Sequence, residues 1–269
     1  KNKVEINLYK YPEDLIRDLE KKDFPDLYGS SNYIWNHELS SMFCKIIKKK
    51  SPNTKIVMGG PNFPTNIEEQ KIFLKKEPWI DYYVIKEGEY SLLKLVQYLM
   101  NKKKNKIRDV PNLVYFKKNK FFTSEKIERI MDLSLIPSPY LSGRLDSFLD
   151  GKLMPVIQTN RGCPFSCTFC TEGQTYWSKV RRKDENVISK EIERISSFLT
   201  NEKNLQSRSD LLIADSNFGM FNEDIKTCEI IANQQKTKGY PTYINVATGK
   251  NRKEKVLEAA KILNGALKL

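Results

Sequence analysis

The sequence predicts an α/β protein with two domains: an open parallel sheet covered by helices on both faces, followed by part of a (β/α) barrel. Three observations support this class. Short apolar runs alternate with amphipathic, helix-like stretches in both halves of the chain, which is typical of parallel sheets. Several of these runs end at glycine or small polar residues, as strands do at turns. An irregular, lysine-containing stretch separates the two series.

In the first series, turn and cap residues set the expected boundaries. Pro12, followed by two acidic residues, suits the positive N-terminal end of a helix. Asn66 has a glutamate three residues later, which is the spacing of a capping box. This order predicts a Rossmann-like or flavodoxin-like sheet over residues 1–105, whose ligands sit beyond the carboxyl ends of the strands. The expected strands are Val4–Leu8, Asp26–Ser31, Lys55–Met58 and Asp81–Ile85, and the expected helices start at Pro12, His37, Asn66 and Ser91.

Residues 106–152 are expected to form a connector that contains a hairpin around Lys117–Lys120. Residues 153–269 then repeat the alternation of strands and helices, which predicts part of a (β/α) barrel. In such barrels the catalytic loops follow the strands. The expected strands are Val156–Thr159, Leu211–Ala214, Tyr243–Val246 and a short one from Ala266, and the expected helices are Asp184–Leu199, Glu223–Lys236 and one from Asn251.

Composition narrows the class of protein. The formal net charge is +13, with 46 basic and 33 acidic residues, but the lysines are scattered over many segments. Scattered charge is typical of a solvated surface, so we do not expect a nucleic-acid partner. No apolar run is long enough to span a membrane, and the polar first residues do not resemble a signal peptide. We therefore expect a cytoplasmic location.

Three of the five cysteines, Cys163, Cys167 and Cys170, lie within eight residues directly after an expected strand. Clustered cysteines in an otherwise cysteine-poor chain indicate a metal centre rather than a disulfide scaffold. Three thiolates can hold an iron–sulfur cluster and leave one iron open, as catalytic metal sites require. Two alternatives remain open: an electron-transfer cluster, and a structural zinc site. A zinc site would draw its fourth ligand from Cys44, Cys228 or His37.

The spacing C-x3-C-x-aromatic-C, with Phe169 in the aromatic position, resembles the cluster motif of the radical S-adenosylmethionine superfamily. The resemblance implies that Cys163, Cys167 and Cys170 bind a 4Fe–4S cluster whose open iron takes the amino and carboxylate groups of S-adenosylmethionine. One electron then cleaves the sulfonium, and a 5′-deoxyadenosyl radical abstracts hydrogen from a small-molecule or biosynthetic-intermediate substrate. A flavodoxin or ferredoxin is the implied electron donor.

The same resemblance implies a binding site for S-adenosylmethionine at the strand tips. In the family, the methionyl end lies at the tip of the second barrel strand, where this chain has Asp215, Ser216 and Asn217. Thr248 and Lys250 follow the third strand and could line the site, together with Phe169 of the cluster loop. An alternative interpretation is that Asp215, Ser216 and Asn217 form a helix N-cap without a ligand.

Through the segments Gly29–Ser31, Val57–Asn62 and Glu87–Glu89, the first domain resembles the cobalamin-binding domain that precedes many radical S-adenosylmethionine proteins. Its double glycine would let the backbone approach the nucleotide tail of the cofactor. The histidine-containing loop of that domain is missing, and His37, the only histidine, lies elsewhere. We therefore expect cobalamin without a histidine ligand; the alternative is a flavodoxin-like module without a ligand. The implied contact residues are Ser30, Ser31, Gly59, Gly60, Pro61, Glu87 and Gly88.

The two resemblances predict a radical S-adenosylmethionine enzyme, with cobalamin-dependent methyl transfer to an unactivated carbon as the leading reaction. A radical rearrangement or cyclisation without methyl transfer is the alternative within the class. A basic, zinc-containing nucleic-acid-binding protein is the alternative of another class. The resemblance also leads us to expect a fragment, which lacks the first unit of the cobalamin domain and the later strands of the barrel.

Overall fold

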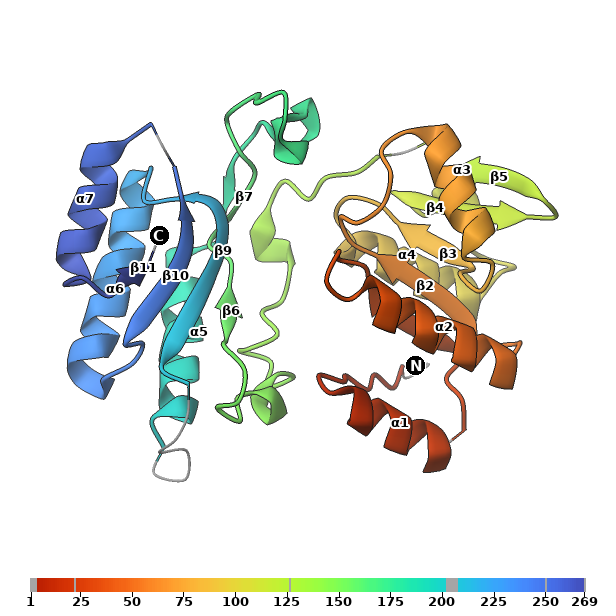
Figure 1. The fold of residues 1–269 in the computed structure, drawn as a ribbon, viewed down its shortest axis with the longest axis horizontal. Helices are drawn as coiled ribbons and strands as arrows, with labels where there is room; N and C mark the ends of the chain where they lie inside the picture. The colour runs from red at the N-terminus through yellow and green to blue at the C-terminus, as the bar shows by residue number, and fades with distance from the viewer. Residues whose placement is uncertain (1–3, 22, 126, 202–207, 250, 269) are drawn as a thin grey trace. The chain divides into compact units, whose positions relative to one another are not determined.

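The computed structural model describes residues 4–21, 23–125, 127–201, 208–249 and 251–268. The chain divides into two compact units, Lys1–Ile130 and Met131–Leu269 (Figure 1). The predicted boundaries lay at residues 105 and 153, so the observed division falls inside the predicted connector.

Unit 1 is a five-stranded sheet with helices between its parallel strands. The strand order is β1-β2-β3-β4-β5, in which β1, β2 and β3 are parallel and β4 and β5 run antiparallel to their neighbours. The elements are α1 (Pro12–Lys21), β1 (Leu27–Ser31), α2 (His37–Lys50), β2 (Lys55–Gly59), α3 (Ile67–Lys76), β3 (Tyr82–Val84), α4 (Glu89–Met100), β4 (Leu113–Lys117) and β5 (Lys120–Thr123).

The two faces of this sheet are covered by different helices. Ile56 of β2 packs in one apolar cluster with Ile47 of α2 and Leu74 of α3. The next residue of the strand, Val57, packs in a second cluster with Leu95 of α4. Because successive side chains of a strand point to opposite faces, α2 and α3 cover one face and α4 covers the other. The predicted doubly wound sheet is confirmed.

Two segments of unit 1 differ from the prediction. Val4–Leu8 was expected to be a strand, but it pairs with no strand in the described part of the chain, and its apolar side chains are exposed. Alternating apolar residues indicate a strand only where an edge is available for pairing. The β4–β5 hairpin was placed in the connector, but β4 pairs with β3 and buries Leu113 and Val114. Burial of these two residues makes the hairpin part of the first sheet.

Unit 2 is a parallel sheet with the strand order β11-β10-β9-β6, together with a short antiparallel pair, β7–β8. From β6 onward, the parallel strands that lie side by side in this sheet are also consecutive in the chain, and a helix connects each to the next, as in a (β/α) barrel. The elements are β6 (Val156–Ile157), β7 (Asn160–Arg161), β8 (Arg181–Arg182), α5 (Glu185–Leu199), β9 (Asp210–Phe218), α6 (Asn222–Lys238), β10 (Tyr243–Thr248), α7 (Lys253–Ile262) and β11 (Leu267–Lys268).

The helices of unit 2 lie along one side of its sheet (Figure 1). Ile192 of α5, Ile231 of α6 and Ala259 of α7 share an apolar core with Ile213 of β9 and Ile244 of β10. On the other side, parts of the strands remain open, because Val156 and Tyr243 are exposed. The predicted (β/α) series is therefore confirmed, and its open side corresponds to the interior of a barrel.

Several boundaries of unit 2 differ from the prediction by two residues or more. Helix α7 begins at Lys253 rather than at Asn251, and no side chain caps it. Strand β9 continues to Phe218, beyond the predicted end at Ala214, because Phe218 pairs with Thr248 after a shift of register in which β9 carries the extra residues. In the described part of the chain, no helix is both long enough and apolar enough to cross a membrane.

Gly60, directly after β2, shows why this turn needs glycine. Its φ is +132°, a conformation that side chains rarely adopt, and a Cβ at Gly60 would stand 2.4 Å from the carbonyl oxygen of Asn32. A Cβ at Gly29 of β1 would meet only a Val57 methyl group, at an ordinary 3.7 Å. Gly60 thus allows the turns after two adjacent strands to pack against each other.

We expect Gly60→Ala to lower the free energy of unfolding of unit 1 by at least about 1–3 kcal/mol, since a strained backbone conformation costs that much before any clash. Urea denaturation followed by circular dichroism measures the change. Gly29→Ala is the matched control and should cost less. Equal stabilities of the two variants would contradict the assigned role of Gly60.

Candidate functional site

The cysteine loop, residues 162–180, is closed at its base by a two-residue ladder. Asn160 and Arg161 of β7 pair antiparallel with Arg182 and Arg181 of β8. Just inside this base, the amide of Cys163 donates to the carbonyl of Trp177 at 2.9 Å. The loop therefore leaves the end of the first strand and returns to it at a fixed base. We call this base, residues 160–163 and 177–182, the neck of the loop.

The three cysteines of this loop are free thiols in different surroundings. Cys163 is 8% exposed at the neck, whereas Cys167 and Cys170 are exposed toward the tip. The tip is a tight turn, because a Cβ at Gly173 would stand 2.2 Å from the carbonyl oxygen of Cys167. Over the described residues, no three cysteine, histidine or acidic side chains gather closely enough to hold a metal ion. Three cysteine thiolates are suitable ligands of an iron–sulfur cluster by their chemistry. The loop that carries them has a fixed neck and an exposed tip.

The residues considered as a fourth metal ligand are engaged elsewhere. Cys44 and Cys228 are completely buried in the cores of units 1 and 2. Burial raises the pKa of both thiols to about 12, so they remain protonated and poor ligands. His37 is held within unit 1, with its Nδ1 3.0 Å from Oδ1 of Asn32. This arrangement favours a three-cysteine site over a structural zinc site.

Asp215, a predicted contact of S-adenosylmethionine, holds the end of the first strand to β9. Its Oδ1 accepts hydrogen bonds from the amides of Thr159 and Asn160 at 2.8 and 3.2 Å. Its Oδ2 accepts from the Asn160 side chain at 2.8 Å and from the Thr159 hydroxyl. The residue is buried, as are Leu211 and Ile213, which lie on the same face of the strand. The carboxylate is therefore committed to the neck of the cysteine loop.

The pKa of Asp215 is raised to about 6. Burial is the largest cause, because a charge in a water-poor environment is disfavoured. The hydrogen bonds from Thr159 and Asn160 favour the carboxylate and oppose this effect, and the nearby Asp224 raises the pKa further.

The other predicted strand-tip residues occupy separate positions. Ser216 is half-buried and follows Asp215 on the opposite face of β9. Nδ2 of Asn217 lies 3.2 Å from Sγ of Cys163, which joins the second strand directly to a predicted cluster ligand. Thr248 is half-buried at the end of β10, and Lys250 lies outside the described residues. Phe169 is 91% exposed at the loop tip.

The alternative interpretation of Asp215, Ser216 and Asn217 as a helix N-cap is wrong. All three belong to β9, and α6 begins only at Asn222. The cap-like contact before this helix comes from Asp224, whose Oδ2 accepts from the Phe221 amide at 3.0 Å.

A second contact that holds the neck in place was not predicted from the sequence. Arg182 donates through Nη1 to Oδ1 of the fully buried Asp224 at 2.9 Å. Its guanidinium lies over the Phe221 ring, 4.4 Å from the centroid. A buried carboxylate needs such a partner. The signal in the sequence was an arginine pair directly after the cysteine loop, which its position alone did not distinguish from surface arginines.

The predicted cobalamin residues lie along one edge of the sheet in unit 1. Ser30 and Ser31 end β1, Gly59 ends β2 and is followed by Gly60 and Pro61, and Glu87 and Gly88 follow β3. Because these three strands are parallel, their carboxyl ends share that edge. The structure therefore places the predicted residues at the position where such sheets bind ligands.

Two of these positions are also used by the protein itself. Glu87 is buried, its carboxylate accepts from the Ile130 amide at 2.7 Å, and its carbonyl accepts from the Asn112 side chain at 3.0 Å. Ser31 accepts through its hydroxyl from the Asn36 side chain at 2.9 Å. These contacts within the protein fix the position of the strand ends at this edge.

Asn32 was missed in the sequence, although it organises this edge. It is fully buried, and its Nδ2 donates to the Asn62 carbonyl at 2.7 Å and to the Tyr83 hydroxyl at 2.9 Å. The Tyr83 hydroxyl donates in turn to the Gly60 carbonyl at 3.0 Å. The network joins the turns after β1 and β2 to the middle of β3. A lone asparagine after small residues gave no pattern by which to recognise it.

An exposed apolar segment follows Asn32 at the same edge. Ile34 is 81% exposed and Trp35 77% exposed, and the Trp35 ring stacks on Tyr33 with centroids 4.6 Å apart. Exposed apolar patches mark surfaces that bind a ligand or a partner. The signal in the sequence was the run Tyr33–Trp35 directly after the strand end.

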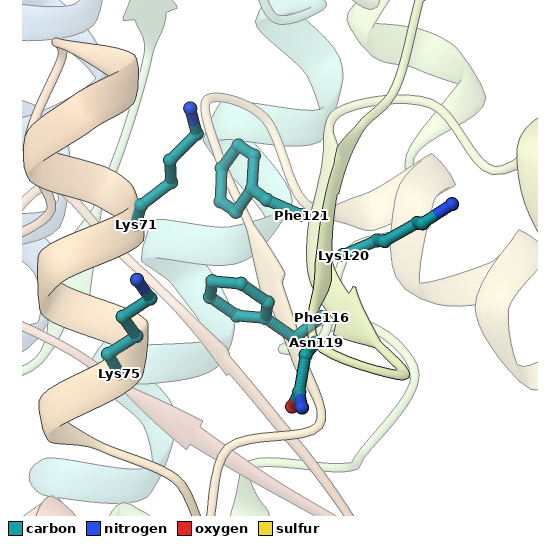
Figure 2. A pocket seen from close by; sticks show the side chains of 6 residues that line it. All are labelled: Lys71, Lys75, Phe116, Asn119, Lys120 and Phe121. Atoms are coloured by element: carbon teal, nitrogen blue, oxygen red, sulfur yellow. The ribbon is translucent and has the colours of Figure 1, made fainter.

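A hollow elsewhere in unit 1 does not coincide with the predicted sites. It lies between α3 and the β4–β5 hairpin, where Lys71 and Lys75 stand opposite Phe116 and Phe121 (Figure 2). The Lys71 ammonium is paired with Glu68 at 2.6 Å. The hollow is open and combines surface lysines with two rings of the hairpin, and it lies at the side of the sheet rather than at its strand ends.

Comparisons with known proteins link both units to one group of enzymes. No family model matches the chain. The cobalamin-dependent radical SAM methyltransferase TokK of Streptomyces tokunonensis is 27% identical over 248 residues, which are 90% of this chain and 35% of TokK. The 2-(S-pantetheinyl)-carbapenam-3-carboxylate methyltransferase of Streptantibioticus cattleyicolor is 28% identical with the same coverage. An anaerobic magnesium-protoporphyrin IX monomethyl ester cyclase of Synechocystis is 29% identical over 62% of this chain and 32% of its own length.

Solved structures show the same fold. The cobalamin-dependent S-adenosylmethionine radical enzyme OxsB, with aqua-cobalamin and S-adenosylmethionine bound, matches 93% of this chain and 35% of its own with a TM-score of 0.65 and 21% identity. The radical S-adenosylmethionine methyltransferase TsrM of Kitasatospora setae, with cobalamin and a [4Fe–4S] cluster bound, matches 93% of this chain and 50% of its own with a TM-score of 0.62 and 14% identity.

The resemblance predicted from the sequence is therefore confirmed: over most of its length the chain is similar to proteins described as cobalamin-dependent radical S-adenosylmethionine enzymes. It spans about one third of the length of the first two curated relatives, since it covers 35% of each.

The pKa of Asp215 predicts a pH dependence of stability. The folded-state pKa of about 6 lies above the ordinary value of 3.8, so the folded chain binds the proton more tightly than the unfolded chain. The contribution of Asp215 to the free energy of unfolding should therefore be greatest below about pH 4 and fall as the pH rises to about 6. Urea unfolding from acid to neutral pH, compared with Asp215→Asn, isolates this contribution. A difference between the two chains that rises with pH would show that the hydrogen bonds outweigh burial.

Proposed function

We propose that this chain is part of a cobalamin-dependent radical S-adenosylmethionine enzyme, that unit 1 binds cobalamin, and that unit 2 binds a 4Fe–4S cluster and S-adenosylmethionine. The observation that carries the proposal is the cysteine loop at the end of the first strand of a (β/α) series, in a chain whose similarity to TokK covers both units.

Unit 2 supports the cluster assignment by position and by chemistry. Cys163, Cys167 and Cys170 lie on one loop with a fastened neck, and the other two cysteines are buried in the cores. Three thiolates leave one iron open for a ligand, which distinguishes a catalytic cluster from an electron-transfer cluster held by four cysteines. Ser216 and Thr248, half-buried at neighbouring strand ends, remain our candidates for contacts with S-adenosylmethionine.

Unit 1 supports the cobalamin assignment through its sheet edge. Gly59, Gly60 and Gly88 keep the strand ends free of bulky side chains, and Trp35, in the turn after β1, offers an exposed ring. A large, partly apolar cofactor would cover this ring and remove it from water. The Asn32 network fixes the turns, so the edge is ordered in advance of binding.

Methyl transfer to an unactivated carbon of a small molecule is our first proposal for the reaction. The two relatives matched over 90% of this chain are methyltransferases, whereas the cyclase is matched over 62%. A rearrangement or cyclisation is therefore the second candidate. When bound, the reduced cluster supplies one electron to S-adenosylmethionine to give the 5′-deoxyadenosyl radical, and methylcobalamin supplies the methyl group. A flavodoxin or ferredoxin is the proposed electron donor.

Within such an enzyme, the residues of this chain bind and orient the cofactors. The Asp215 and Arg182 contacts hold the neck of the cysteine loop, and would thereby fix the position of Cys163 as a ligand of the cluster. The open side of the unit 2 sheet faces the barrel interior, where water must be excluded from radical chemistry.

Anaerobic reconstitution with iron and sulfide should give about four irons per chain, as a 4Fe–4S cluster requires. The reduced protein should show an electron paramagnetic resonance signal that changes shape with S-adenosylmethionine. Cys167→Ala should abolish this signal, whereas Cys228→Ala, which changes a buried core thiol, should retain it. Binding of one zinc and no iron would overturn the proposal in favour of a zinc protein.

We expect His37 not to ligate the cobalt of bound cobalamin, because its Nδ1 is engaged by Asn32 and its Nε2 lies 3.5 Å from Oε1 of Glu77. Cob(II)inamide, which lacks the nucleotide base, should bind and give a paramagnetic resonance spectrum without nitrogen splitting. The same compound with free imidazole is the positive control. Nitrogen splitting in the protein complex would contradict the expected absence of a histidine ligand. If the chain binds neither cobinamide nor hydroxocobalamin, the cobalamin part of the proposal is wrong.

A further inference from the structure

Among the predicted strand-tip residues that the structure describes, Asn217 is the one with a side-chain contact to a cysteine of the loop. Its Nδ2 stands 3.2 Å from Sγ of Cys163. Side-chain amide nitrogens are donors only, so the amide donates and the sulfur accepts. Cys163 is also the most buried of the three loop cysteines, at 8% exposure, which keeps water from competing for its sulfur.

The position of Asn217 is fixed by its neighbours rather than by the contact itself. Asp215, two residues earlier on β9, is fastened to Thr159 and Asn160, which lead into Cys163. Phe218, the next residue, is fully buried and pairs with Thr248. Both ends of the contact are therefore held to each other through β9 and the loop neck, whereas Cys167 and Cys170 are exposed at the tip.

Such a contact has a defined effect on an iron–sulfur cluster. Reduction adds negative charge, part of which lies on the ligating sulfurs, so a donor to one of these sulfurs stabilises the reduced cluster more than the oxidised one. Hydrogen bonds to sulfur are one of the ways in which proteins set cluster potentials. The donor should therefore raise the reduction potential and make the cluster easier to reduce.

We propose that Asn217 is a positioning residue that donates a hydrogen bond to the Cys163 ligand and raises the reduction potential of the cluster, instead of contacting S-adenosylmethionine through this nitrogen. This inference rests on the proposed function, because it requires a cluster on Cys163. It assigns to Asn217 an effect on electron transfer that is present without any substrate.

The test is a redox titration of the reconstituted 269-residue chain without S-adenosylmethionine, followed by electron paramagnetic resonance. Asn217→Leu removes the donor at similar size, and Asn217→Asp replaces it with a carboxylate. Both variants should have a more negative midpoint potential than the unchanged chain, with the larger shift in Asn217→Asp because of its added charge.

Asn245→Leu is the matched control. The Asn245 side chain donates to Sδ of Met154 at 3.2 Å, so this variant loses an amide–sulfur contact of the same length in the same unit, but not one to a loop cysteine. Its midpoint potential should equal that of the unchanged chain.

The outcomes separate the inference from the proposed function. If the unchanged chain forms no 4Fe–4S cluster, the proposed function fails. If the cluster forms but either Asn217 variant keeps the original potential, or Asn245→Leu shifts it equally, the inference fails and the function stands. Should Asn217→Leu not retain iron, Asn217→Ala, which also lacks the donor and adds no charge, is titrated in its place. Loss of the cluster from both variants, with an intact cluster in Asn245→Leu, would show a purely structural role and overturn the inference.

Discussion

The arrangement of unit 2 depends on one buried carboxylate. Asp215 accepts hydrogen bonds from the backbone and the side chains of Thr159 and Asn160, at the point where the chain leaves the first strand for the cysteine loop. Burial of this group costs free energy, as its raised pKa indicates. The cost is offset because backbone donors that would otherwise be unpaired at a strand end find an acceptor. Without this acceptor, the entry to the loop would have no fixed direction.

The rest of the loop follows from this anchor. With Asn160 fixed, the β7–β8 ladder sets the return path, and Arg182 fastens that path to the buried Asp224. Cys163 lies inside the fastened region, whereas Cys167 and Cys170 lie beyond it and are exposed. The loop thus holds one of the proposed cluster ligands in its fastened region and presents the other two at an exposed tip.

The sequence predicted the order of elements and the cysteine motif, because both depend on local patterns. The predicted strands and helices from Pro12 to Met100 are present with small shifts, since apolar periodicity and caps such as Asn66, which accepts from the amides of Glu68 and Glu69, act over a few residues. Val4–Leu8 was predicted wrongly because pairing depends on a distant edge. The orientation of Asp215 was not predictable for a similar reason: its partners lie 55 and 56 residues away along the chain.

Both units use the same physical device at their strand ends, although their side chains differ. In unit 1, the buried Asn32 joins the turns after β1 and β2 through the carbonyl of Asn62 and the hydroxyl of Tyr83. In unit 2, the buried Asp215 joins the ends of the first two strands. In each case a polar group from within the sheet satisfies neighbouring strand ends. The segments just beyond, Tyr33–Trp35 and the tip of the cysteine loop, are left exposed. Fixed strand ends with exposed segments just beyond them suit the binding of a bulky cofactor, because binding residues on loops are positioned by the rigid scaffold that carries them.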